Sequence, residues 1–176
     1  MLEKLRKLAN ILYWAATAVL IALPIAALGY LLAETPNPNR ASALFPHIDI
    51  IASPTGLAFW SAFSAGALSF LLFIGFLWSL RGLFDFYRKG QILTLHAAGA
   101  ILRLGKWLIA LALVRFMTLP TQTLLLTSNN PDGHRQLAIS ISDHEVGFLL
   151  AAGLLTLIGW AMNEAVRISD ENKAFV

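Results

Sequence analysis

One charged side chain stands well inside a long apolar stretch of this sequence. Arg115 lies within the apolar segment 104–126, which Pro120 interrupts. An arginine at the centre of a membrane span costs about 2.5–3.5 kcal/mol to insert, so an ionisable residue at this depth indicates a functional site by default. Two interpretations stay open. Arg115 binds a ligand or an ion, or it snorkels to the nearer surface and pairs with Asp143 or, preferentially, Glu145.

Histidines and carboxylates also gather between the apolar segments. His47, His134 and His144 are weak candidates for a metal site, because zinc and copper accept imidazole and carboxylate ligands. No two of them have His-x-x-x-His spacing, and the consecutive residues Asp143, His144 and Glu145 would face different directions on a helix. Solvated loop side chains are the account we favour, because loops normally collect such groups, so we assign neither a metal nor a cofactor.

Other catalytic patterns are absent from the sequence. The chain has no cysteine, which excludes thiolate metal sites, disulfides and cysteine nucleophiles. It has no glycine-rich phosphate loop, no HExxH and no GxSxG element. No apolar segment carries a histidine, aspartate or glutamate at its centre, as a haem site or a proton relay would require. We therefore expect no enzyme activity, no catalytic residue and no direct binding of nucleic acid.

Four apolar segments are long enough to cross a bilayer as helices. A hydrocarbon core about 30 Å thick needs about 20 apolar residues. We expect spans at approximately 11–33, 57–80, 104–119 and 146–162. The composition agrees, because 57% of the residues are hydrophobic and 13% are charged, whereas soluble domains are about 25% charged. The expected fold class is an all-α membrane protein, with residues 1–176 forming one four-transmembrane-helix bundle in contact with membrane lipid.

Basic residues predict the orientation of these spans. Of the 13 lysines and arginines, ten lie before the first span, between the second span and the first turn of the third, or after the fourth. Arg40 and Arg135 lie on the opposite side. Because positively charged residues stay on the cytoplasmic side, both termini should be cytoplasmic. The first span is longer than the 7–15-residue core of a signal peptide, which favours an uncleaved anchor.

The second span is expected to continue beyond the membrane. No strong helix breaker occurs between residues 57 and 89, which would give a helix of 33 residues, roughly 50 Å long at 1.5 Å per residue. Gly90 is a suitable residue to end it. Thr94 can cap the N-terminus of a third helix that starts at Leu95. These signals predict a cytoplasmic helical hairpin.

On the outer side the pattern indicates strands. Pro120 should end the third helix, because a proline disfavours helical backbone in the residue before it. Segments 121–127 and 136–142 flank a turn-rich stretch at 129–133, and the second segment alternates apolar and polar residues. We expect a small β-hairpin there, with segment 47–51 as a candidate third strand.

Exposed residues at the cytoplasmic ends are candidates for binding a partner. They are Phe84, Tyr87, Arg88 and Lys89 in the hairpin, and Glu164, Arg167, Asp170 and Glu171 after the fourth span. The alternative is that these residues are solvated or contact lipid headgroups. Small residues of the second span form the pairs Ala62-x-x-x-Gly66 and Ala65-x-x-x-Ser69. Such pairs allow close helix packing within the chain or in a homo-oligomer.

Several short motifs resemble a known family. The stretch Leu83-Phe84-x-x-Tyr87-x-x-Gly90-x-Ile92-Leu93-Thr94 precedes Ile101-Leu102-Arg103-x-Gly105, and the chain closes with Glu164-Ala165-x-Arg167 before Glu171-Asn172. In order and spacing these resemble the membrane family called domain of unknown function 2975. The resemblance implies a bacterial inner-membrane protein with no established activity. Some relatives are encoded beside a small helix-turn-helix regulator, which implies membrane-linked control of transcription.

The function expected from these observations is binding of another protein. We expect a non-enzymatic inner-membrane protein that acts through its cytoplasmic helical extensions, in the regulatory role that the resemblance implies. The alternative is an accessory or structural subunit of a larger respiratory or photosynthetic membrane complex, packing laterally through the second span. A third hypothesis is a small-solute or metal-sensing transporter that uses Arg115 and the outer loops.

Overall fold

Four long helices dominate the structure. The computed structural model describes residues 2–33, 36–139 and 143–174, and no strand occurs among them. The long helices are α1 (Leu2–Ala33), α3 (Gly56–Arg88), α4 (Leu95–Leu126) and α5 (Asp143–Ala174). The short ones are the 3₁₀ turn η1 (Pro38–Arg40) and α2 (Ala41–Leu44). All four long helices are long and apolar enough to cross a membrane, which confirms the expected all-helical architecture at that level.

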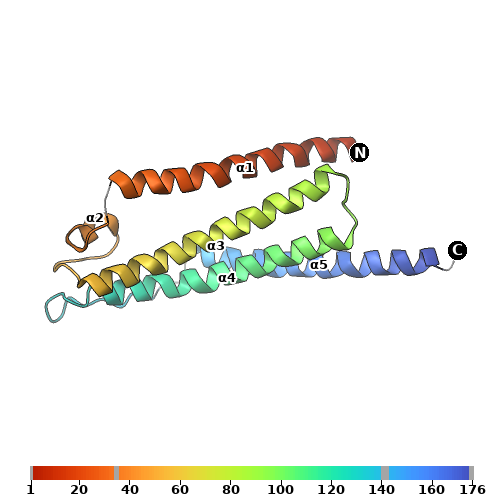
Figure 1. Ribbon diagram of the computed structural model, residues 1–176. Helices are drawn as coiled ribbons and strands as arrows, with labels where there is room; N and C mark the ends of the chain where they lie inside the picture. Colours follow the sequence, from red (N-terminus) through yellow and green to blue (C-terminus); the bar gives the residue numbers. More distant parts are fainter. Residues whose placement is uncertain (1, 34–35, 140–142, 175–176) are drawn as a thin grey trace.

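Helix α4 lies at the centre of the arrangement. It packs against α3 on one side and α5 on the other, whereas α1 packs chiefly against α3 (Figure 1). Half of the most apolar window of α4 is buried within the chain, against 11% for the corresponding windows of α1 and α5. Figure 1 shows both termini at the end where α3 connects to α4, and α1 leaning away from α3 toward α2. We call these two ends of the molecule the hairpin end and the α2 end.

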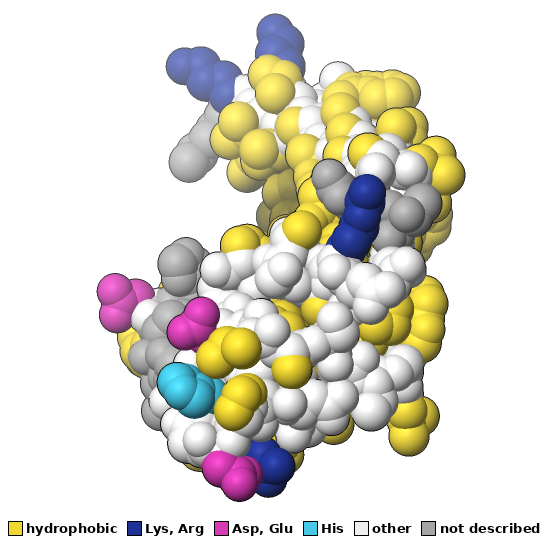
Figure 2. All heavy atoms as spheres, turned by 90° about the vertical axis from the view of Figure 1, so that its left-hand side faces the viewer, with side chains coloured by type: hydrophobic (Ala, Val, Ile, Leu, Met, Phe, Trp, Pro, Cys, Tyr) yellow, Lys and Arg dark blue, Asp and Glu magenta, His cyan; other side chains and the backbone are white. Residues whose placement is uncertain are grey.

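Large apolar side chains cover much of the outer surface. Examples from three helices are Ile25, Leu71 and Leu150, each with well over half of its surface exposed. Figure 2, which looks onto the α2 end, shows hydrophobic side chains gathered on α1 and along the flanks. A soluble protein rarely exposes apolar patches larger than a few hundred Å². The surface therefore fits contact with lipid, in keeping with four helices of spanning length.

The buried core has three parts along α4. Toward the hairpin end, Leu83, Ala100, Ile101 and Leu104 form one cluster, against which Tyr87 and Met162 pack. In the middle, α4 and α5 share a second cluster of Leu108, Leu111 and Ala152. At the α2 end, Phe45 and Ile48 pack on Phe59 and Leu126. The short helix α2 and its loop thus cover the end of the α3–α4 pair.

The connection between α3 and α4 matches the expectation from sequence. Helix α3 has 33 residues and ends at Arg88, and Gly90 follows with a φ of +80°, a conformation that favours glycine. The Oγ1 atom of Thr94 accepts a hydrogen bond from the Ala97 N–H at 3.2 Å. Both the predicted helix end and the predicted N-cap are confirmed.

The predicted β-hairpin is wrong. Residues 121–126 form the last turns of α4, and residues 47–51 and 136–139 have no strand conformation; residues 140–142 lie outside the described residues. The buried side chain of Asn130 takes the hydrogen bonds that strand partners would make. Its Oδ1 accepts from the N–H groups of Ile51 and Ala52, and its Nδ2 donates to the Asp49 carbonyl. One side chain therefore satisfies the loop backbone locally.

The expected helix end at Pro120 is also wrong. Helix α4 continues through the proline to Leu126. A proline within a helix costs about 3 kcal/mol because it lacks an N–H and crowds the preceding turn. Here hydroxyl groups bond to carbonyls around it: Thr121 Oγ1 donates to Met117 at 2.7 Å and Thr123 Oγ1 to Leu119 at 3.0 Å. Together with the full burial of Leu126, these contacts hold the helix together.

Helix α5 starts beside the middle part of α4, several turns before the level at which α4 ends. After α4 the chain turns and runs back beside it, with the Gln136 N–H donating to Thr127 Oγ1 and the Ala138 N–H to Thr123 Oγ1. Glu145, in the first turn of α5, therefore lies level with Arg115 rather than with Leu126. This offset places the start of α5 opposite the charged residue of α4.

Candidate functional site

Arg115 lies further from the end of its helix than the expected span 104–119 implies. Residues 116–126 add about three turns of helix beyond it, roughly 16 Å at 1.5 Å per residue. On α3, the exposed Trp60 and Trp78 lie about 27 Å apart by the same measure, close to the thickness of a hydrocarbon core. Ser69 lies midway between them, and its hydroxyl is 2.9 Å from that of Thr118, one turn from Arg115. Arg115 thus lies near the middle of the stretch that these tryptophans bound, about three turns before the end of α4.

The expected acidic partner of Arg115 is in place. Its Nε atom lies 3.7 Å from Glu145 Oε1, and the side chains are 52% and 12% exposed, respectively. A well-formed charge-assisted hydrogen bond is shorter, at about 2.7–2.9 Å. The two groups are therefore paired electrostatically, while the guanidinium keeps a large accessible surface.

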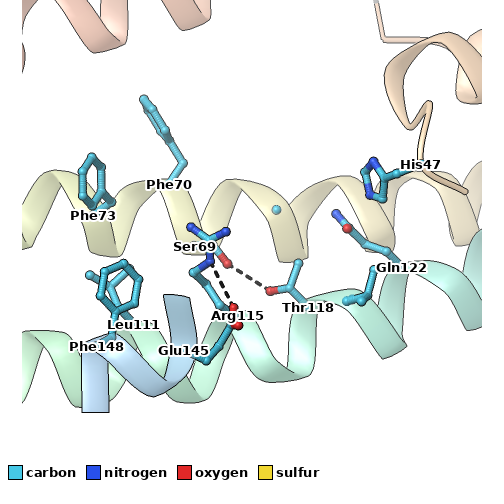
Figure 3. A pocket seen from close by; sticks show the side chains of 12 residues that line it. His47, Ser69, Phe70, Phe73, Leu111, Arg115, Thr118, Gln122, Glu145 and Phe148 are labelled. Atoms are coloured by element: carbon cyan, nitrogen blue, oxygen red, sulfur yellow. Dashed lines mark hydrogen bonds and ion pairs between the residues drawn. The ribbon is translucent and has the colours of Figure 1, made fainter. Parts of the chain in front are cut away.

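A pocket of about 490 Å³ surrounds this ion pair. Figure 3 shows the Ser69–Thr118 hydroxyl pair beside Arg115, Gln122 and His47 toward the α2 end, and three phenylalanines toward the other end. Those phenylalanines are Phe70, Phe73 and Phe148, and Leu111 lies beside them. The pocket therefore has a polar end and an aromatic end, with the charged pair between them.

Small residues of α3 make room for the pocket and for α4. A Cβ atom at Gly66 would lie 3.1 Å from Gln122 Nε2, and that amide donates to the Ala62 carbonyl at 3.2 Å. Ala62 is fully buried, and Ser69 bonds to Thr118. Of the small residues that the sequence analysis offered for close packing, Ala62, Gly66 and Ser69 thus contact α4 of the same chain.

At the hairpin end, one predicted partner-binding residue, Arg88, joins Arg81 in holding α1 to α3. The Arg88 guanidinium lies 3.8 Å from the centroid of the Tyr13 ring, and its Nε is 2.7 Å from Asp85. Arg81 donates to the hydroxyls of Tyr13 and Thr17. The sequence analysis missed this cluster, because aromatic and hydroxyl residues near the end of a span are typical of a membrane interface and their pattern does not indicate a contact with another helix.

The remaining hairpin candidates are divided between core and surface. Tyr87 and Phe84 are half-buried, and Tyr87 packs against the cluster around Leu83. Lys89 stays exposed, with its Nζ 2.5 Å from Asp85. A Cβ atom at Gly90 would collide with the Arg6 side chain of α1, so Arg6 packs closely against the turn between α3 and α4.

The predicted charge ladder at the end of α5 is present and exposed. Arg167 Nη2 is 2.7 Å from Glu164 Oε1, and Arg167 Nε is 3.6 Å from Glu171 Oε1. The side chain of Asp170 lies outside the described residues. No ion pair in the described part of the chain joins this ladder to the hairpin.

The structure describes the side chains of two of the three candidate histidines, His47 and His134. His47 lines the pocket near its polar end, whereas His134 is exposed in the turn after α4. The side chain of His144 lies outside the described residues. Among the residues that the structure describes, no group of three or more histidines and carboxylates is close enough to hold a metal ion.

Comparison with known proteins gives no relative: no family model, no curated protein and no solved structure matches this chain.

The ion pair predicts a measurable coupling between α4 and α5. We expect Arg115→Met and Glu145→Gln each to destabilise the protein, and the double variant to lose about 1–3 kcal/mol less than the sum of the two. The reason is that either single change removes the attraction between these two opposite charges and leaves the remaining charge in apolar surroundings. Unfolding of the detergent-solubilised protein, followed by tryptophan fluorescence, measures all four free energies.

The exposed pair of Arg135 and Asp132 is the matched control for this cycle. Its atoms are 3.6 Å apart, about as close as those of Arg115 and Glu145, but its side chains are 64% and 99% exposed. Its coupling should be close to zero. A coupling between Arg115 and Glu145 no larger than that of the control would show that the mid-span pair does not join the two helices.

Proposed function

We propose that this chain is a non-enzymatic, multi-pass protein of the bacterial inner membrane that binds another protein at its cytoplasmic end, in a regulatory role. The four helices of spanning length support the membrane part of the proposal. The resemblance of its short motifs to the membrane family with neighbouring helix-turn-helix regulators supports the regulatory part. The single observation that carries partner binding is the projection of α5 beyond the hairpin.

The projection follows from how α5 lies along α4. A Cβ atom at Gly105 would meet Thr156, and one at Gly159 would meet Leu102, so the two helices run antiparallel in close contact. This spacing brings the buried Val166 level with the start of α4. Residues 167–174 then extend roughly 12 Å further. Figure 1 shows the end of α5 protruding past the hairpin.

The projecting surface has the character of a small docking site. Ile168 is 49% exposed and lies beside the charge ladder of Glu164, Arg167 and Glu171. An exposed apolar residue ringed by charges of both signs is the usual anatomy of a modest protein interface. We therefore move the proposed surface from the hairpin to α5, because Arg88 and Tyr87 are engaged within the chain.

The α5 projection predicts a charge-dependent contact in cells. A photo-crosslinking amino acid at Ile168 should give one discrete protein adduct, identified by mass spectrometry. Adding Arg167→Glu should reduce the adduct severalfold, because it reverses the central charge of the ladder. Arg135→Glu, at the other end of the molecule, is the matched control and should leave the adduct unchanged. An adduct that persists in Arg167→Glu would mean that α5 does not dock its partner through this ladder.

Orientation is a separate expectation of the proposal. The basic residues at the ends of α1, α3 and α5 and at the start of α4 share the hairpin end, so this end should face the cytoplasm. Because the chain has no native cysteine, single cysteines can be labelled without background. In intact spheroplasts an impermeant maleimide should label Ser128→Cys and spare Glu171→Cys. The reverse pattern would overturn the orientation, and with it the cytoplasmic location of the partner.

An accessory role in a larger membrane complex is the second candidate. Its lateral contact would not use the small residues of α3, which face α4. The favouring observation is α1, whose Leu28 and Leu32 are strongly exposed and which leans away from α3 toward the α2 end (Figure 1). This role would give membrane-protein adducts from a crosslinker at Leu28 in place of the adduct from Ile168.

A further inference from the structure

The guanidinium of Arg115 directs more hydrogen-bond donors at its pocket than the surrounding side chains use. An arginine has five N–H donors, and in the described part of the chain its polar contact is the single ion pair with Glu145. Half of the side chain is accessible at a depth near mid-span, where hydrocarbon supplies no acceptor. Donors left in that state carry a high free-energy cost, so the site favours a molecule with acceptor oxygens.

The charges of the pocket favour an uncharged molecule. The formal charges of Arg115 and Glu145 cancel. A ligand with a net charge would therefore leave an uncompensated charge inside the apolar slab, which is costly in a medium of low dielectric constant. A neutral molecule whose oxygens accept from the guanidinium avoids that cost.

The shape and lining of the pocket favour a planar head with an apolar tail. The rings of Phe70, Phe73 and Phe148 line one end, and flat conjugated rings gain from offset or edge contacts with such side chains. The volume of about 490 Å³ is within the range of roughly 300–1,000 Å³ that is typical of small-molecule sites. The depth of the pocket means that its ligand arrives through the lipid.

We propose that this pocket binds an uncharged, lipid-soluble ligand whose planar head carries carbonyl oxygens, the chemical class of the isoprenoid quinones. The head lies against Phe73 and Phe148, and a carbonyl oxygen accepts from the Arg115 guanidinium. No electron transfer is part of this assignment, which concerns binding alone. It goes beyond the partner-binding function, because it places a second site in the same chain, near the other end of α5.

The test compares probes that share one tail and differ in the charge of their heads. The purified full-length protein in dodecyl maltoside is titrated calorimetrically with decyl-ubiquinone, decanoate and decylphosphocholine, and heats of partition into empty micelles are subtracted. We expect saturable binding of the quinone near one molecule per chain. The carboxylate and the zwitterion should not bind saturably and should not displace the quinone.

Variants show whether binding uses Arg115. Arg115→Met combined with Glu145→Leu keeps the pocket neutral but removes the donors, and should weaken quinone binding about tenfold or more. Arg103→Met is the matched control, since Arg103 is an exposed arginine of the same helix outside this pocket, and its affinity should equal that of the wild type. Gel filtration confirms that each variant remains monodisperse.

Three results would overturn the proposal. The first is unchanged quinone affinity in the double variant, which would place the quinone elsewhere. The second is displacement by decylphosphocholine or decanoate, which would assign the pocket to a zwitterionic lipid or to an organic anion. The third is no saturable binding above the micelle blank, which would leave water as the occupant. None of these results affects the crosslinking test at Ile168, so the two proposals can fail separately.

Discussion

A guanidinium far from either end of a long apolar helix requires an opposite charge beside it, and this requirement governs how the rest of the chain is arranged. Arg115 lies about 16 Å from the end of α4, measured along the helix axis. To meet it, Glu145 is carried on the first turn of a helix that starts at that depth. The chain between the two helices must therefore turn back along α4 before α5 can begin.

That return segment creates a second requirement, because irregular backbone at such a depth needs hydrogen-bond partners. The threonines near the end of α4 supply them. Thr123 and Thr127 each bond to a carbonyl of their own helix and also accept an N–H from residues 136–139. Asn130 likewise accepts hydrogen bonds from backbone N–H groups of the loop before α3. The pocket around the ion pair lies between α3, α4 and the first turns of α5.

The sequence predicted the parts of this structure that depend on local signals. The length of α3, the turn at Gly90 and the cap at Thr94 follow from helix-ending chemistry within a few residues. The pairing of Arg115 with Glu145 followed from the scarcity of charge in the spans. The predicted β-hairpin was wrong because hydroxyl side chains and Asn130 form hydrogen bonds with the loop backbone in place of strand partners. The predicted helix end at Pro120 was wrong because tertiary packing outweighs the free-energy cost of a proline within the helix. The Tyr13–Arg88 contact and the pocket join helices that are distant in sequence, so no local pattern could reveal them.

The depth at which α5 begins decides whether this account of the pocket holds. Val146, in the first turn of α5, and Leu124, near the end of α4, are both exposed on the surface of the protein, so each can carry a spin label. In lipid nanodiscs, the relative collision rates with oxygen and with a polar nickel complex report the depth of each label. We expect the label at Val146 to lie well below that at Leu124, with high access to oxygen and low access to nickel. Equal, shallow depths would contradict a helix that starts opposite Arg115.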